Sequence, residues 1–152
     1  MLGSGTRQHA EDMRSRVAGV LAPMGLRLSA EKTKITHIDE GLDFLGWHIQ
    51  RHRKRGTDRQ YVYTYPSRKA LRAVMGKVKE ICRKSVNLPL PALLHRLNPV
   101  LRGWCAYFRP GVSSATFQHL GHCAWQRVIG WAQRKHHKAN WKTIRRPYCR
   151  GG

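Results

Sequence analysis

The chain has 152 residues, enough for one modest domain or two small units, and 41% of them are hydrophobic, which allows a packed core. It holds 29 Lys and Arg against 8 Asp and Glu, a formal net charge of +21. This excess favours a phosphate-rich partner, and the lack of a long apolar run excludes a membrane-spanning helix.

The positive charge is unevenly distributed. Residues 1–50 hold six basic and six acidic residues, whereas residues 51–152 hold 23 basic residues and only two acidic ones. A membrane-surface helix would concentrate its cations on one element, but here they are spread over several, so no membrane partner is predicted. The polar start of the chain and four widely spaced cysteines without a CxxC pair are typical of a cytoplasmic protein with reduced thiols.

The N-terminal part predicts one helix and two strands. Apolar residues recur at helical spacing over residues 7–24, with Thr6 as a cap and Gly25 as a left-handed end. Residues 32–38 are moderately rich in β-branched side chains and predict a strand. Residues 42–49 predict a second strand that is apolar on both faces and therefore buried.

A charged loop and a third strand follow. Residues 51–59 form a cationic stretch around Gly56, and residues 60–65 alternate in a way that places three tyrosines on one face of a strand. The strands on either side of this loop predict a β-hairpin.

From Pro66 onward the hydrophobic period becomes helical. Residues 67–84 predict an amphipathic helix whose outer face is basic, and residues 90–108 keep the same register. Asn98 is interpreted as an N-cap, with Pro99 as the first helical residue after a kink. A third helix begins at Ser113 or Ser114, and a basic tail follows from residue 136. The fold class is α+β, with a short β-hairpin followed by a basic three-helix bundle.

Catalytic and metal sites are weakly supported. The acidic residues Asp39, Glu40 and Asp43 flank a turn, and turn chemistry explains them better than Mg²⁺ binding does. His119, His122 and Cys123 fall within one helical turn but lack a fourth ligand at a recurrent zinc spacing. The sequence therefore predicts no catalytic residue, metal ligand or cofactor.

The basic segments carry the stronger signal, because several elements that share one sign of charge imply a common partner surface. The residues predicted from this pattern to bind RNA are Arg51, Arg53, Lys54, Arg55, Arg68, Lys69, Arg72, Lys77, Arg127, Arg134, Lys135 and Lys138. Aromatic residues lie between the cations. For Trp125, Trp141 and Tyr148, both stacking on bases and packing within the protein stay open.

Four segments resemble the end of bacterial group II intron reverse transcriptases, also called maturases. Residues 26–47 (LRLSAEKTKITHIDEGLDFLGW) are similar to the end of the palm, with Leu42 where the family usually has Phe. Residues 61–71 (YVYTYPSRKAL) resemble the crossover into the first thumb helix. Residues 97–109 (LNPVLRGWCAYFR) resemble the signature of the maturase-specific domain, also called thumb or domain X, and WAQRKH at 131–136 resembles its closing motif.

This resemblance implies a palm remnant at residues 1–65 and a maturase-specific helical domain at 66–152. In the family, the thumb grips the template–primer duplex and the maturase region docks on intron RNA. Arg102 and Arg109 fall in the signature and complete the set of predicted RNA-binding residues, whereas Trp104 and Phe108 extend the leucine stripe and are predicted to lie in the core.

The family's catalytic YADD hairpin has no counterpart in this sequence, so Mg²⁺ is expected only in a complete family member and this chain alone is predicted to be inactive. The predicted function is that of an RNA-binding maturase remnant that assists splicing and mobility of a group II intron. The alternative is the thumb half of a split RNA-directed DNA polymerase, acting in trans with an upstream palm and fingers chain. A chance likeness in a generic nucleic-acid-binding protein, and an unselected pseudogene product, are the remaining hypotheses.

Overall fold

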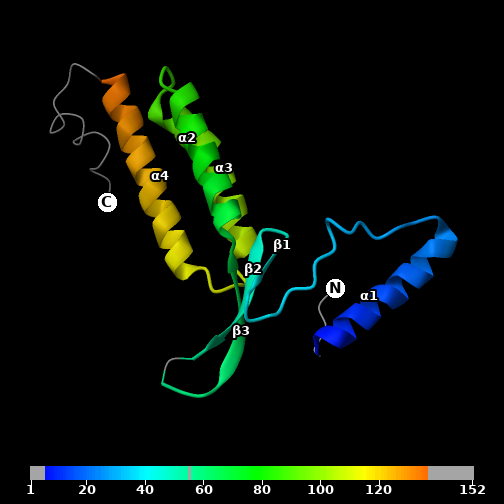
Figure 1. The fold of residues 1–152 in the computed structure, drawn as a ribbon. Helices are drawn as coiled ribbons and strands as arrows, with labels where there is room; N and C mark the ends of the chain where they lie inside the picture. Colours follow the sequence, from blue (N-terminus) through cyan, green and yellow to red (C-terminus); the bar gives the residue numbers. More distant parts are fainter. Residues whose placement is uncertain (1–5, 55, 137–152) are drawn as a thin grey trace. The chain divides into compact units, whose positions relative to one another are not determined.

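A computed structural model describes residues 6–54 and 56–136. Its helices and strands follow one another in the order α1, η1, β1, β2, β3, α2, α3 and α4 (Figure 1). The chain forms two compact units, the first comprising residues 1–42 and 50–62 and the second comprising residues 43–49 and 63–152. The α+β fold class predicted from the sequence is confirmed.

The first unit begins with helix α1 (Arg7–Leu21), which continues into a single 3-10 turn, η1 (Ala22–Met24). Gly25 ends the turn in the left-handed conformation, with a φ of 72°, so the predicted helix and its glycine end are confirmed. None of the described residues of this unit is buried, and Val20 and Met24 on the apolar stripe of the helix are each 69% exposed.

The strand predicted for residues 32–38 is absent, and this prediction was wrong. The backbone turns instead at Ser29, whose carbonyl accepts hydrogen bonds from the N–H groups of Lys32 (3.2 Å) and Thr33 (2.9 Å). A strand requires a ladder of backbone hydrogen bonds to a neighbouring strand, and this segment accepts a single one from a described strand residue, from the N–H of Arg51 in β2 to the carbonyl of Ile38 (3.1 Å). A segment rich in β-branched residues does not form a strand unless a neighbouring strand pairs with it.

The three strands β1 (Leu42–Phe44), β2 (Trp47–Arg53) and β3 (Gln60–Pro66) form an antiparallel sheet in the order β1-β2-β3. The single buried strand predicted for residues 42–49 was wrong, because Leu45 and Gly46 both adopt positive φ, at 49° and 85°. Two consecutive positive φ values make a tight hairpin turn of the type that joins twisted strands. Phe44 and Leu45 are 53% and 71% exposed, and β2 continues through Arg53 into the segment predicted as a loop.

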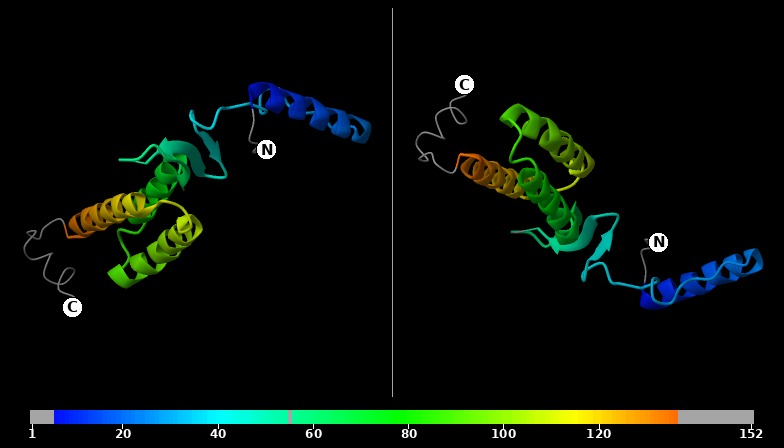
Figure 2. Two further views of the ribbon diagram at one scale, coloured as in Figure 1. Left: turned by 90° about the horizontal axis from the view of Figure 1, so that it is seen from below. Right: turned by 90° about the horizontal axis from the view of Figure 1, so that it is seen from above.

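The second unit is dominated by helices α2 (Arg68–Lys84), α3 (Leu90–Phe108) and α4 (Ser114–Lys135), which lie side by side in Figure 1 and in both views of Figure 2. Ser67 caps α2 through its hydroxyl oxygen, which accepts a hydrogen bond from the N–H of Ala70 at 3.2 Å. The predicted start of α4 is confirmed at Ser113, although the Ser113 hydroxyl donates to the carbonyl of Phe108 (2.7 Å) instead of capping the helix.

Helix α3 is continuous through Pro99, so the interpretation of Asn98 as an N-cap after a kink was wrong. A proline inside a helix removes one backbone hydrogen bond and usually breaks or kinks the helix. Here Leu93 and Leu97 before the proline and Phe108 after it lie on one buried stripe. Packing of that stripe keeps the helix in register, and this tertiary effect outweighs the local preference.

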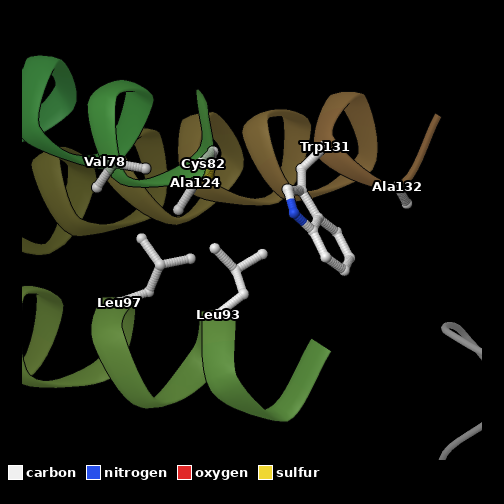
Figure 3. Close-up of a cluster of buried hydrophobic side chains, with 7 residues drawn as sticks. All are labelled: Val78, Cys82, Leu93, Leu97, Ala124, Trp131 and Ala132. Atoms are coloured by element: carbon white, nitrogen blue, oxygen red, sulfur yellow. The ribbon is translucent and has the colours of Figure 1, made fainter. Parts of the chain in front are cut away.

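The core lies between the three helices. Its buried residues are Val78 and Cys82 of α2, Leu93 and Leu97 of α3, and Ala124, Trp131 and Ala132 of α4. Figure 3 shows the two leucines pointing from α3 toward the other two helices, with the Trp131 ring at one end of the cluster. The indole N–H of Trp131 donates to the carbonyl of Ser85 at 2.7 Å, which ties α4 to the end of α2.

A second, aromatic cluster joins α3 to the turn between β1 and β2. The ring centroids of Trp47 and Phe108 are 4.8 Å apart, and Trp104 packs against Phe108 at 4.6 Å. The hydroxyl of Tyr107 donates to the carbonyl of Leu45 at 2.9 Å. Phe108 is buried as predicted, whereas Trp104 is half-buried at the edge of this cluster.

Candidate nucleic-acid interface

The outer side of α2 carries an ordered line of cations. At 100° per residue, spacings of four, seven and four residues keep four basic side chains within a narrow sector of the helix. All four are exposed, and they extend over about 22 Å of helix axis at 1.5 Å per residue. We call this surface the α2 ridge, and its members are Arg68, Arg72, Lys79 and Arg83.

The α2 ridge runs beside the buried side of the helix, because at 100° per residue the sector of Val74, Val78 and Cys82 is centred about 110° from that of the ridge. A helix with one apolar and one basic face therefore places these charges in solvent while its inner face is fixed by packing. Lys69 and Lys77 are also exposed on α2 but lie outside this line.

In the part of the chain that the structure describes, no carboxylate neutralises the charges of the α2 ridge. Among the described residues, none of its four members takes part in an ion pair. Glu80 is the sole acidic residue from residue 66 to the C-terminus, and its carboxylate accepts from the ammonium of Lys84 at 2.6 Å. The hydrogen bond from Lys84 lowers the pKa of Glu80, so this acid stays charged and remains committed to a residue off the ridge.

Arg102 and Arg109 form a basic pair on α3 and its C-terminal end. The two residues are seven positions apart, which is close to two helical turns, so they share one face. Both side chains are exposed, on the side opposite the buried Leu97 and Phe108.

Helix α4 carries a similar pair, Arg127 and Arg134, again exposed and seven positions apart. Burial raises the pKa of the Cys82 thiol on α2, and the positive charges of Arg134 and Arg127 act in the opposite direction. These two arginines therefore lie on the side of α4 that borders α2. Lys135 differs from them, because its ammonium donates to the carbonyl of Leu88 and lies 5.3 Å from the ring centroid of Trp131.

The hairpin cations are partly neutralised by acids. The guanidinium of Arg51 donates to both carboxylate oxygens of Asp39, at 2.5 and 2.7 Å, and these hydrogen bonds lower the pKa of Asp39 and raise that of Arg51. Arg53 pairs with Asp58, whereas Lys54 is exposed. Of these three residues predicted to bind RNA, Arg51 and Arg53 are therefore paired with acids, and the positive potential around them is weaker than around the α2 ridge. The predicted residues Arg55 and Lys138 lie outside the described residues.

Among the aromatic residues, Trp125 on α4 is 56% exposed. Its ring lies nearly parallel to that of His122, with 6.3 Å between centroids and 26° between planes, and His122 is held by Gln126 through a 2.8 Å contact. An exposed aromatic on a helix without a single acid is suited to stacking on a base. Trp141 and Tyr148 lie outside the described residues.

The described part of the chain contains no group of three or more His, Cys, Asp or Glu side chains placed to hold a metal ion. His119 instead approaches the sulfur of Cys123, with 3.7 Å between its Nε2 and the Sγ atom. Among residues 6–54 and 56–136, no helix combines the length and the apolar character needed to cross a bilayer.

The family model of the group II intron maturase-specific domain matches residues 71–149, about half of the chain. The chain therefore belongs to this family, as the LNPVLRGWCAYFR segment predicted. The protein YkfC of Escherichia coli strain K12 is 36% identical over 86 residues, which make up 52% of this chain. The chain covers 23% of the length of that relative.

Lys79 and Arg83 are not among the residues predicted to bind RNA, although the predicted basic outer face of residues 67–84 includes both. Charge alone does not distinguish them from Lys69 and Lys77. The four residues differ in their angular position around the helix axis. That position can be assigned only when the register of α2 relative to its buried residues is known.

Proposed function

We propose that this chain binds structured group II intron RNA through its helical part and in this way assists splicing and mobility of the intron. The observation that carries the proposal is the α2 ridge, four exposed cations without an acidic partner among the described residues, mounted on a packed core. Maturase domains of this family bind intron RNA in general, which supports RNA as the polyanion.

The mechanism would be electrostatic positioning on the phosphate backbone. Each cation that contacts a phosphate releases condensed counterions, so affinity falls steeply as salt rises. Because the helices are fixed by Leu93, Leu97 and Trp131, the cations keep a constant spacing and select RNA by shape more than by sequence. Arg102 and Arg109 on α3 would supply a second group of phosphate contacts.

In this proposal residues 66–152 form the RNA-binding maturase-specific domain and residues 1–65 are a remnant of a palm. Residues 43–49 and 63–65 belong with the helices in the second compact unit, so the turn at Leu45 and Gly46 would move with the RNA-binding part. A template–primer duplex is a further polyanion that the same basic helices could grip, and the test below includes it.

The proposal is tested by removing the ridge charges. Arg68, Arg72, Lys79 and Arg83 are all changed to Gln, and binding of a fluorescein-labelled RNA stem-loop is followed by anisotropy between roughly 50 and 200 mM KCl. A matched control changes four exposed cations of the first unit to Gln, namely Arg14, Arg16, Arg27 and Lys34. An RNA–DNA duplex serves as a second probe.

We expect the ridge variant to lose most of its affinity and to show a slope of log K against log salt that is shallower by about 3 to 4, close to one per lost phosphate contact. The control loses the same formal charge and should keep most of its affinity and a similar slope. Equal losses in both variants would show that net charge alone drives binding and would reject the ridge as the site.

A further inference from the structure

Gly76 lies in the middle of α2 and is not explained by the fold. A Cβ added at this position would meet no atom within 4 Å, and the φ angle of Gly76 is outside the positive region that favours glycine. Apart from proline, glycine is the least favourable residue in a helix interior, so an alanine would suit the free protein better. The same is true of the helical glycines Gly19, Gly103 and Gly121, so what distinguishes Gly76 is its place beside the α2 ridge.

The surroundings of Gly76 point to an anionic ligand. It follows Arg72 by four residues and precedes Lys79 by three and Arg83 by seven, so ridge cations flank it along the helix axis. The acid Glu80 lies four residues after Gly76, and its carboxylate is engaged by the ammonium of Lys84 at 2.6 Å. Arg72 and Lys79 are about 10.5 Å apart along that axis. None of these three cations has an ion-pair partner in the part of the chain that the structure describes.

The missing side chain opens a notch at the edge of the ridge. Backbone Cα atoms of a helix lie about 2.3 Å from its axis, whereas side chains extend the helix to a radius of roughly 5 to 6 Å. At Gly76 a ligand can therefore approach the main chain about 3 Å more closely than at its neighbours. A thin, extended and negatively charged chain fits this shape, whereas a flat anionic surface would rest on the flanking side chains.

We infer that Gly76 is a docking notch where the sugar–phosphate backbone of RNA crosses α2, with Arg72 on one side and Lys79 and Arg83 on the other. This inference rests on the proposed function and specifies which part of the RNA meets which part of the helix. The long cations neutralise phosphates, and the glycine admits the backbone between them.

The notch is tested with Gly76→Ala and Gly76→Gln in the full chain. Both replacements favour the helix, and neither changes the charge. Gly19 in α1 provides the matched control, because a Cβ there would also meet no atom within 4 Å, yet Gly19 lies outside the α2 ridge. Thermal unfolding is followed by circular dichroism, and binding of the labelled RNA stem-loop by anisotropy over a salt series.

We expect the melting temperature to rise in both Gly76 variants, while the affinity for RNA falls roughly threefold with Ala and on the order of tenfold with Gln, without a change in the salt slope, because no cation is lost. The Gly19 variants should keep the affinity of the parent chain. Greater stability with weaker binding is the opposite of what a residue needed only for folding would give.

Four outcomes would overturn the notch. Gly76 variants that lose stability would show that the fold itself requires glycine. Variants with unchanged affinity would remove the notch but leave the proposed function standing, provided that the ridge variant still binds poorly. If polyglutamate also bound the chain, and if the Gly76 variants weakened that binding as much as they weaken RNA binding, the surface would be a general polyanion site. A parent chain that ignores RNA at low salt would refute the proposed function together with the notch.

Discussion

Replacing Trp131 by Phe tests the interaction that holds the three basic helices together. The Trp131 side chain is completely buried, and its indole N–H donates to the carbonyl of Ser85 at 2.7 Å. Phenylalanine keeps an aromatic ring but removes this donor and part of the ring volume. The carbonyl of Ser85 retains one partner, the N–H of Leu88 at 3.1 Å, so it is not left unsatisfied.

The expected loss of stability is about 2 to 4 kcal/mol. One hydrogen bond contributes about 1 kcal/mol net, and the smaller ring forfeits roughly 1 to 2 kcal/mol of buried apolar contact and leaves a cavity. The cation–π contact with Lys135, at 5.3 Å, adds about 0.5 kcal/mol because a phenyl ring attracts the ammonium less strongly.

Urea unfolding followed by far-UV circular dichroism measures this loss, and Trp125→Phe is the matched control. Trp125 lies on the same helix but is 56% exposed, so its replacement should change the free energy of unfolding by less than about 0.5 kcal/mol. If the two variants had the same free energy of unfolding, or if Trp125→Phe were the less stable one, the assignment of Trp131 to the buried end of the core would be wrong.

Four further outcomes are expected. Arg102→Ala together with Arg109→Ala should weaken RNA-stem-loop binding in the anisotropy assay without loss of helix content, and unchanged affinity would remove this face from the interface. Gly111→Ala should destabilise the chain by about 1 to 3 kcal/mol in urea, because the new methyl group would lie 2.6 Å from the carbonyl oxygen of Thr64, and an unchanged midpoint would contradict the clash. Asp39 should titrate in carbon-detected NMR below its ordinary pKa, so the stabilisation from its ion pair is present at neutral pH and disappears as pH falls through the folded-state pKa. Arg51→Ala should raise the pKa of Asp39 toward its ordinary value, and an unchanged pKa would contradict the role of Arg51. In primer extension with Mg²⁺, the chain alone should give no product above background, and clear synthesis would refute the inference drawn from the missing YADD motif.

The helical half could be predicted well from sequence because its hydrophobic period is regular. Val74 and Val78 recur at helical spacing and are buried, and the leucines of α3 keep one register across two turns. The strands were predicted less well. The turn at Leu45 and Gly46 requires a positive φ at Leu45, a non-glycine residue, and the local sequence pattern does not indicate this conformation. The adjacent Trp47 packs against Phe108 of α3, a contact that only the tertiary structure provides.

The sequence by itself determined the charge, the family and the helical periods, because each depends on residue types at short spacings. Tertiary structure alone decided which cations are available to a partner: Arg51 and Lys135 are engaged by distant residues of the chain, whereas Arg72, Lys79 and Arg83 face solvent around Gly76. Availability depends on which acids and carbonyl groups the fold brings within hydrogen-bonding distance, and the partners of Arg51 and Lys135 lie 12 and 47 positions away along the chain.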